Sequence, residues 1–214
     1  MSNTRRLLIT AGPTHEPIDP VRYLGNRSSG KLGIALAEAG QAAGWEIRLL
    51  MGPTETEMPD GLDVRRFVST ADLAGLLDEH LPWCDALVMT AAVADYRPKQ
   101  RSAVKLPRSA GLTLELEPTE DLVAACVKRK RSDQVIIGFA LEEPDQLEDR
   151  ARRKMRRKAL DAIVANPLIT MGADTIDAQV LTPDEQHLRP GAMPKPQFAT
   201  WLVDWIGHHD FQSK

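Results

Sequence analysis

The sequence predicts an α/β fold in which helices cover both faces of a mostly parallel sheet. Three observations support this prediction. Short apolar runs recur along the chain, stretches with helical periodicity separate them, and several of the runs are almost wholly apolar, as in strands buried on both faces. Strands alternating with helices are typical of βαβ units. We therefore expect a Rossmann-like arrangement, with ligands bound where the strands end.

The first half of the chain alternates regularly between strand and helix. Strands are expected over residues 7–10, 45–51, 64–68 and 86–90. A helix over 31–43 would carry Leu32, Ala35, Leu36 and Ala39 on one face. A second helix is expected over 71–80, which Ser69 or Thr70 can cap.

The second half departs from this alternation at two places. The basic segment 97–111 contains two prolines and leads into 112–116, where leucine alternates with polar residues as in a half-exposed strand. We interpret residues 97–116 as a flap. Thr119 would then cap a helix over 120–130, followed by strand 135–139, helix 146–160 and strand 162–165. The proline-rich tail, 183–214, is expected to be partly mobile, with a short helix over 201–206.

The composition indicates one cytoplasmic domain covering residues 1–214. Hydrophobic residues make up 43% and charged residues 27% of the chain, as in ordinary globular proteins. Nothing approaches the roughly 18 consecutive apolar residues of a membrane span, and the first apolar run is too short for a signal peptide. Cys84 and Cys126 are expected to be small buried hydrophobes rather than catalytic thiols. The five histidines show no metal-ligand spacing, so we expect no metal site built by the protein alone.

A cluster of positive charge lies at residues 150–158, where seven of nine residues are Lys or Arg. Because the formal net charge of the whole chain is −3, this cluster indicates a local anionic ligand more than a nucleic acid. A solvated helix face is the simpler alternative. A nucleic-acid-binding module remains a rival function, but Leu147, Ala151 and Met155 form an apolar stripe that predicts a half-buried helix.

A second candidate anion site precedes the helix at Lys31. The segment 25–31 nearly matches a phosphate-binding P-loop, but Leu32 lacks the hydroxyl that such a loop offers to magnesium. Ser28, Ser29 and Gly30 nevertheless lead into a helix N-terminus, whose free N–H groups favour an anion. A plain capped helix is the alternative. Because the chain has no Gly-x-Gly-x-x-Gly turn, an NAD(P)-dependent oxidoreductase is a weaker rival.

Four segments together resemble the phosphopantothenoylcysteine synthetase family. Residues 11–33 are similar to its opening signature, 91–97 to its second and 138–142 to its third. The fourth is matched by 150–161 followed by Ala165-Asn-Pro. Order and spacing agree from Leu7 to about Val180. In bacteria these synthetases are often the C-terminal half of a bifunctional flavoprotein, whose decarboxylase half is not in this sequence; the chain is then a separately encoded synthetase or an excised domain.

The resemblance implies a two-step ligation in coenzyme A biosynthesis. The carboxylate of 4′-phosphopantothenate would attack the α-phosphate of a nucleotide, CTP in bacterial members, with Mg²⁺ bound through the nucleotide phosphates. The amine of L-cysteine would then displace CMP from the acyl-cytidylate. Such chemistry needs positioning and positive charge rather than a protein nucleophile. The family also implies a homodimer, paired through the flap, without nucleic acid or membrane. The sequence leaves the choice between CTP and ATP open.

The resemblance also assigns roles to individual residues. Asn26 would hold the carboxylate and then the mixed anhydride, although by itself it could be a turn former. Ser28, Ser29, Gly30, Ala91 and Ala92 would bind the same substrate. The expected nucleotide-binding residues are Asp95, Lys105, Asp121, Phe139, Lys154 and Lys158. On residue patterns alone, Asp95 could cap a turn, Phe139 could belong to the core, and the two helical lysines could be solvated.

The flap departs from the family pattern. The family has Lys-Ile-Lys-Lys, with a catalytic first lysine, where this chain reads Ala103-Val-Lys-Leu-Pro-Arg108. Aligning Lys105 with the catalytic lysine keeps the next strand in register with a shorter turn, and we adopt that alignment. The alternative places Ala103 there and predicts a crippled enzyme. Residues 118–121 replace a family Asn-Pro-Asp, so only Asp121 carries over.

Overall fold

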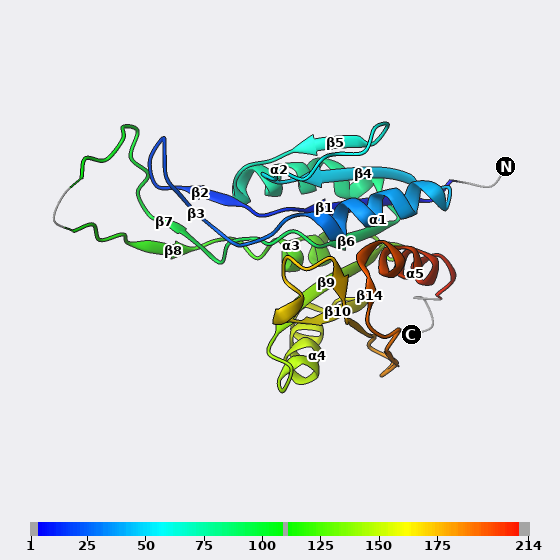
Figure 1. The fold of residues 1–214 in the computed structure, drawn as a ribbon. Helices are drawn as coiled ribbons and strands as arrows, with labels where there is room; N and C mark the ends of the chain where they lie inside the picture. The colour runs from blue at the N-terminus through cyan, green and yellow to red at the C-terminus, as the bar shows by residue number, and fades with distance from the viewer. Residues whose placement is uncertain (1–3, 109–110, 210–214) are drawn as a thin grey trace.

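A computed structural model describes residues 4–108 and 111–209, and within them the core is a mixed sheet of eight strands (Figure 1). From edge to edge the strands are β13 (His187–Leu188), β12 (Gln179–Leu181), β10 (Ala162–Pro167), β9 (Val135–Glu142), β6 (Ala86–Met89), β1 (Arg6–Ala11), β4 (Glu46–Met51) and β5 (Asp63–Arg66). The six strands from β10 to β5 run parallel, whereas β12 pairs antiparallel with β10 and β13 pairs antiparallel with β12. The mostly parallel sheet is confirmed.

Helices cover both faces of this sheet, as predicted. On one face lie α1 (Lys31–Ala42) and α5 (Lys195–His208), and on the other α2 (Thr70–His80), α3 (Leu122–Arg129) and α4 (Leu147–Lys158). Strand β1 shows why both faces need covering, because its side chains alternate between the layers. Leu7 and Ile9 belong to the buried cluster that includes α1 and α5, and Leu8 belongs to the cluster that includes α2, α3 and α4. All three are fully buried.

Local sequence explains where two of the helices lie. The Ser69 hydroxyl accepts a hydrogen bond from the Asp72 N–H at 3.2 Å, and the Asp72 carboxylate accepts one from the Ser69 N–H at 2.8 Å. This capping box fixes the start of α2. Helix α4 buries Leu147, Ala151 and Met155 at 3%, 0% and 2% exposure, so the predicted apolar stripe docks the helix on the sheet.

A long arm projects from one end of the sheet and consists of two paired-strand ribbons (Figure 1). One ribbon joins β2 (His15–Pro17) to β3 (Tyr23–Gly25), and the other joins β7 (Tyr96–Pro98) to β8 (Leu116–Pro118). The second ribbon is the base of the predicted flap, of which residues 109–110 lie outside the described part. The predicted strand 112–116 is wrong in position, because pairing with β7 extends only from Leu116 to Pro118.

A buried aspartate ties the two ribbons of the arm together. Asp19 is 2% exposed and accepts hydrogen bonds from the backbone N–H groups of Val21, Arg22 and Leu106 at 2.8, 2.9 and 3.1 Å. The Arg22 guanidinium donates to its second oxygen at 2.5 Å. Burial alone would raise the pKa of the Asp19 carboxyl, but these donors outweigh it and the pKa is lowered. The flap is therefore anchored at Leu106.

The predicted helix over 201–206 is wrong in its start and in its length, within the part of the tail that ends at residue 209. Helix α5 has 14 residues and begins at Lys195, well before the expected residue 201. Pro194 and Pro196 are compatible with this start, because the first N–H groups of a helix need no intrahelical partner. Phe198 and Leu202 are fully buried against α1, so this part of the tail belongs to the core. Residues 210–214 lie outside the described part.

Helix α3 also begins later than expected. Asp121, rather than Thr119, is its N-cap, because the Asp121 carboxylate accepts from the Ala124 N–H at 3.1 Å. The Thr119 hydroxyl is used elsewhere and donates to the Ala94 carbonyl at 2.5 Å. The remaining short elements are η1 (Leu81–Trp83), η2 (Leu168–Thr170), β11 (Thr175–Ile176) and β14 (Met193–Pro194). None of the helices in the described ranges combines the length and apolar character that crossing a bilayer requires.

Candidate functional site

An open cavity of about 760 Å³ lies at the carboxyl ends of the central strands, a size typical of small-molecule sites. The segments after β6, at the end of β9 and at the end of β10 contribute to its walls, and so do the N-termini of α1 and α3 and one face of α4. The site therefore lies at the sheet edge that the fold class predicts. Eleven of the twelve predicted site residues line it: Asn26, Ser28, Ser29, Gly30, Ala91, Ala92, Asp95, Asp121, Phe139, Lys154 and Lys158.

The N-terminus of α1 forms one wall of the cavity. Its N-cap, Gly30, has φ 72°, and a Cβ there would lie 2.4 Å from the Met51 Cε. The left-handed backbone therefore favours glycine here, and a larger residue would also have to displace the Met51 methyl group. The hydroxyls of Thr54 and Thr56 each donate to the Ser29 carbonyl at 2.8 Å, which holds the loop in place. The N-cap Gly30 has no side chain with which to cap α1, and the Ser28 and Ser29 hydroxyls accept from the N–H groups of Gly30 and Lys31 only at 3.4 and 3.5 Å. Such long contacts suit a helix end that receives an anion.

Asn26 bridges two of the predicted signatures. Its Nδ2 donates to the Val93 carbonyl at 2.9 Å, linking the loop before α1 to the segment after β6. This bond fixes the amide and leaves its Oδ1 and a second N–H for a ligand. Ala91 and Ala92 lie beside it, but their N–H groups are already used, donating to Thr10 Oγ1 at 3.2 Å and to the Gly12 carbonyl at 2.9 Å. These two residues can shape the cavity but have no N–H group left to offer.

Lys154 and Lys158 line the opposite wall. The Lys154 ammonium donates to the Phe139 carbonyl at 2.7 Å. Burial lowers the pKa of Lys154, and the positive charge of Lys158 lowers it further. The Lys158 ammonium lies 2.8 Å from Asp121 Oδ1. Burial alone would raise the pKa of the Asp121 carboxyl, but Lys158 and the Ala124 N–H outweigh it, so that pKa is lowered.

The structure shows the environments of two predicted nucleotide contacts, Phe139 and Asp95, for which the residue patterns left alternatives open. Phe139 was expected at the end of its strand, but β9 continues to Glu142, so Phe139 lies in mid-strand and its half-buried ring packs against the core. The Phe139 carbonyl accepts the hydrogen bond from the Lys154 ammonium. Asp95 is exposed at the cavity rim, where its own carbonyl accepts the Thr119 N–H at 2.9 Å.

The basic cluster of α4 is partly neutralised within the chain, so its concentration of positive charge does not by itself indicate an anionic ligand. Four of its cations face carboxylates. The pairs are Arg150–Glu142 and Arg152–Glu148 at 2.9 Å, Lys158–Asp121 at 2.8 Å and Arg156–Glu185 at 3.9 Å. An anion site here must therefore be argued from the residues that face the cavity.

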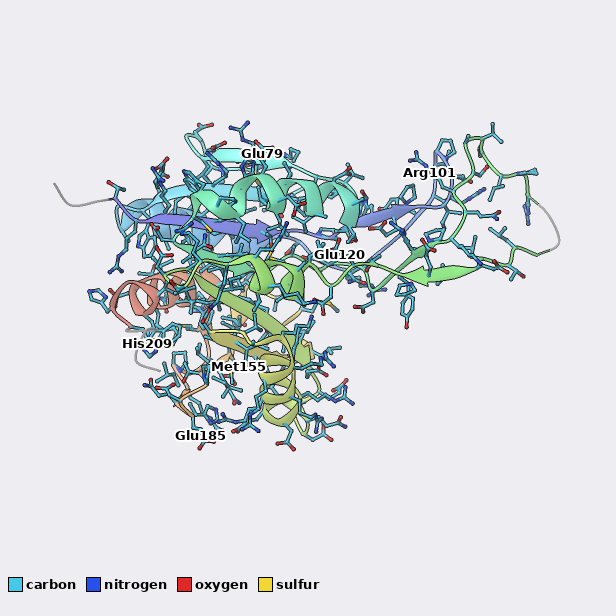
Figure 2. All side chains as sticks on the ribbon, turned by 180° about the vertical axis from the view of Figure 1, so that it is seen from behind. Glu79, Arg101, Glu120, Met155, Glu185 and His209 are labelled. Carbon is cyan, nitrogen blue, oxygen red and sulfur yellow. The ribbon has the colours of Figure 1, made fainter. Side chains whose placement is uncertain are left out.

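Lys105 is the predicted residue that the structure does not bring to the cavity. It is exposed on the flap next to Leu106, whose carbonyl accepts from Arg22 Nη1 at 3.3 Å. Figure 2 shows how far the flap extends: Arg101 lies out on the arm, and Glu120 lies where the arm meets the body. The alignment of Lys105 with a catalytic lysine therefore stays a prediction.

Several cavity residues were not predicted. Asn166, at the end of β10, donates to the Thr170 hydroxyl at 2.9 Å, and Lys31 pairs with Asp174 at 2.7 Å. Lys195 is 8% exposed and donates to the Ala173 carbonyl. Asn166 stood in the fourth signature and could have been singled out. Lys195 could not have been singled out from the sequence, because it is the first residue of α5 and the proline-rich tail around it shows no periodic pattern.

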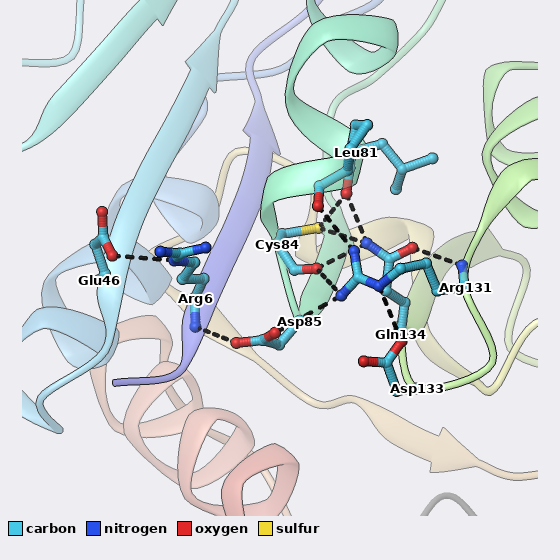
Figure 3. Close-up of polar contacts among 9 residues, drawn as sticks. Arg6, Glu46, Leu81, Cys84, Asp85, Arg131, Asp133 and Gln134 are labelled. Atoms are coloured by element: carbon cyan, nitrogen blue, oxygen red, sulfur yellow. Dashed lines mark hydrogen bonds and ion pairs between the residues drawn. The ribbon is translucent and has the colours of Figure 1, made fainter. Parts of the chain in front are cut away.

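The two cysteines are buried away from this chemistry. Cys84 Sγ donates to the Leu81 carbonyl at 3.4 Å and lies beside Gln134, which bonds to the carbonyls of Leu81 and Cys84 (Figure 3). Burial raises the pKa of Cys84 to about 12 and that of Cys126 to about 11. Both thiols therefore stay protonated near neutral pH. Among the described residues no group of three or more His, Cys, Asp or Glu side chains could hold a metal ion.

The fold and the cavity define an α/β protein with a cation-lined ligand site at the carboxyl edge of its sheet. The chain matches the family described as the DNA/pantothenate metabolism flavoprotein C-terminal domain over residues 2–209, and it belongs to that family. The resemblance to the phosphopantothenoylcysteine synthetase part of the bifunctional coenzyme A biosynthesis proteins is thereby confirmed.

Sequence relatives include proteins named for coenzyme A biosynthesis and one with another name. The coenzyme A biosynthesis bifunctional protein CoaBC of Mycobacterium tuberculosis is 38% identical over 218 residues, which cover 94% of this chain and 52% of that protein. A protein from an unknown prokaryotic organism, named cysteine/cysteine sulfinic acid decarboxylase, is 44% identical over 174 residues, 80% of this chain and 48% of its own. The chain spans about half the length of the curated relatives it matches.

A solved structure extends the comparison to three dimensions. The crystal structure of the C-terminal domain of a coenzyme A biosynthesis bifunctional protein CoaBC is 34% identical, with a TM-score of 0.82. The match covers 94% of this chain and 93% of that one. The similarity in three dimensions therefore extends over nearly the whole chain.

Proposed function

We propose that the protein joins 4′-phosphopantothenate to L-cysteine in coenzyme A biosynthesis, with CTP cleaved to CMP and pyrophosphate. The observation that carries this proposal is the convergence of all four signature segments on one cavity. The segments are far apart in the chain and meet only through the fold. The naming of the relatives as coenzyme A biosynthesis proteins supports it further.

The first step activates a carboxylate. An oxygen of the 4′-phosphopantothenate carboxylate forms a bond to the α-phosphorus, the bond from that phosphorus to the bridging oxygen breaks, and pyrophosphate leaves with the electron pair. Asn26 would hold the carboxylate without adding a negative charge. The ammonium groups of Lys154 and Lys158 would face the negative charge of the phosphates, and the N-terminus of α1 offers a further anion site.

The second step forms the amide. The cysteine nitrogen bonds to the acyl carbon and releases a proton, while the carbon–oxygen bond to the nucleotide breaks and CMP leaves. Neither step needs a nucleophile from the protein, which agrees with the two inert thiols of the described residues. Catalysis by positioning and charge, the role proposed here, can supply most of the rate.

Mg²⁺ fits the donors of this cavity. The carboxylates of Asp95 and Glu120 line it and form no ion pair with another described residue. Mg²⁺ prefers oxygen ligands and often takes one or two carboxylates together with phosphate oxygens. These two residues would share the ion with the nucleotide, where it would neutralise phosphate charge.

A homodimer paired through the arm is part of the proposal. Exposed apolar side chains gather on the arm: Val21 (61% exposed), Tyr23 (54%), Tyr96 (56%), Val104 (70%) and Leu116 (46%). A monomer would leave this surface in water, whereas a second copy would cover it. Light scattering coupled to gel filtration should give twice the chain mass, and Tyr96→Glu should shift the protein toward monomer.

Pyrophosphate release tests the activity directly. The complete mixture contains CTP, Mg²⁺, 4′-phosphopantothenate and cysteine, and each is omitted in turn, with ATP replacing CTP in parallel. We expect release that requires phosphopantothenate, and the faster nucleotide identifies the base. If neither nucleotide gives release, the ligase proposal fails and NAD(P) binding becomes the next experiment. Nucleic-acid binding by α4 would instead show a steep loss of affinity with salt.

A further inference from the structure

The charges that line the cavity are not all accounted for by contacts within the chain. Six cationic and four acidic side chains face it. Of the cations, Lys31 and Lys158 are paired with carboxylates, and Lys154 and Lys195 donate to carbonyls. Within residues 4–108 and 111–209, the side chain of neither Arg27 nor Arg157 forms a hydrogen bond or an ion pair. Two guanidinium groups at the cavity are therefore free to receive an anion.

Arg157 lies beside the two lysines on the part of α4 that lines the cavity. It follows Lys154 by three residues and precedes Lys158 by one on α4, and all three line the cavity. Residues three apart on a helix are neighbours on its surface. The buried side chains of Leu147, Ala151 and Met155 fix the rotation of the helix, so the face that carries Arg157 is held toward the cavity.

The donor inventory distinguishes Arg157 from its neighbours. Each lysine already donates one hydrogen bond within the protein, Lys154 to the Phe139 carbonyl and Lys158 to the Asp121 carboxylate. Arg157 keeps all five N–H donors of a planar guanidinium, whose fork matches two oxygens of one phosphate. The cost of holding an unpaired cation close to two others is offset once a polyanion binds.

We propose that Arg157 is a third binding residue for the nucleotide phosphates, acting with Lys154 and Lys158. This inference rests on the proposed ligase function and adds a residue that the resemblance did not assign. The alternative is a guanidinium that is merely solvated. Arg153 provides the comparison, because it is one turn earlier on α4, is exposed and also lacks a partner among the described residues, but does not line the cavity.

The test compares Arg157→Gln with the matched variant Arg153→Gln. Nucleotide affinity is measured by calorimetry with CTP and Mg²⁺, and KM for 4′-phosphopantothenate is measured by pyrophosphate release. We expect Arg157→Gln to weaken CTP binding about tenfold, the size of one charge-assisted hydrogen bond at a partly solvated site. Arg153→Gln should stay within about twofold of the wild type, and Arg157→Lys should fall between, because the charge remains but the fork is lost.

Three outcomes would overturn the inference. Equal CTP affinity in Arg157→Gln and Arg153→Gln would show a solvated charge while leaving the ligase function intact. An unchanged CTP affinity with a raised KM for 4′-phosphopantothenate would assign Arg157 to the other substrate's phosphate. A wild-type protein that binds neither CTP nor ATP and releases no pyrophosphate would overturn the ligase function as well.

Discussion

Lys158→Gln tests the role of the α4 wall most sharply, because it separates activity from stability. The Lys158 side chain is 13% exposed and its ammonium lies 2.8 Å from Asp121. Removing it takes away a cation proposed to face the phosphates. It also leaves the Asp121 carboxylate uncompensated beside them, so both changes oppose nucleotide binding. We expect kcat/KM for the nucleotide to fall about 10²- to 10³-fold, the usual loss when one preorganised donor is removed.

The free energy of unfolding should hardly change in the same variant. The Asp121 side chain is 49% exposed, and ion pairs with solvent access contribute about 0–1 kcal/mol to stability. Such a loss would lower the melting temperature by about 2–4 °C at most in a chain of this size. The folded state therefore survives, and the loss of turnover can be assigned to chemistry or binding.

A second substitution supplies the control. Asp121→Asn keeps the cap on the Ala124 N–H, since Asn and Asp are similarly good N-caps, but removes the negative charge. In the Lys158→Gln background it should restore part of the lost kcat/KM, by about tenfold, because the phosphates no longer face a bare carboxylate. Steady-state pyrophosphate release measures all four proteins. Turnover of Lys158→Gln within about threefold of the wild type would refute the role of this wall.

Other predictions concern the second lysine, the substrate amide, the flap and the tail. Because burial lowers the pKa of Lys154, CTP affinity measured by calorimetry should fall as the pH rises through that lowered pKa, and Lys154→Arg should flatten the fall; equal pH profiles would contradict this. Asn26→Asp should abolish pyrophosphate release, because a second carboxylate would repel the substrate's, and normal turnover would make Asn26 only a turn former. Lys105→Gln should lower turnover about 10²-fold if the flap alignment is right, and full activity would reject that alignment. Phe198→Ala should cost about 3–5 kcal/mol in urea unfolding, because the ring is fully buried, and a loss below about 1 kcal/mol would mean that α5 is not part of the core.

The central fold was predictable because its signals are local and repeated. Strand β6 is wholly apolar, β1, β4 and β10 each contain a run of at least three apolar residues, and α1 and α4 carry clear apolar stripes. The first six residues of helix α5 were not predicted, because Pro194 and Pro196 indicate a loop, although proline is compatible with the first turn of a helix. The antiparallel strands β12 and β13 have only three and two residues, too few to show a period of two.

The site was predictable from motifs more than from physics alone. Asn26, Lys154 and Lys158, which the signatures singled out, line one cavity, whereas their roles stay predictions. The sequence could not show that Asp121 neutralises Lys158 or that the Phe139 carbonyl holds Lys154, because these contacts join residues 37 and 15 positions apart. The place of Lys105 relative to the cavity depends on how the arm is oriented, which no local pattern encodes.

Isotope transfer tests the ligase account most directly. The carboxylate of 4′-phosphopantothenate is labelled with ¹⁸O, and the protein is incubated with it, CTP, Mg²⁺ and cysteine. The products are then separated, and the ¹⁸O content of each is measured by mass spectrometry. If an acyl-cytidylate forms and the amine displaces CMP, one labelled oxygen must appear in the CMP phosphate and none in pyrophosphate. Label found in inorganic phosphate or pyrophosphate, with unlabelled CMP, would contradict the account.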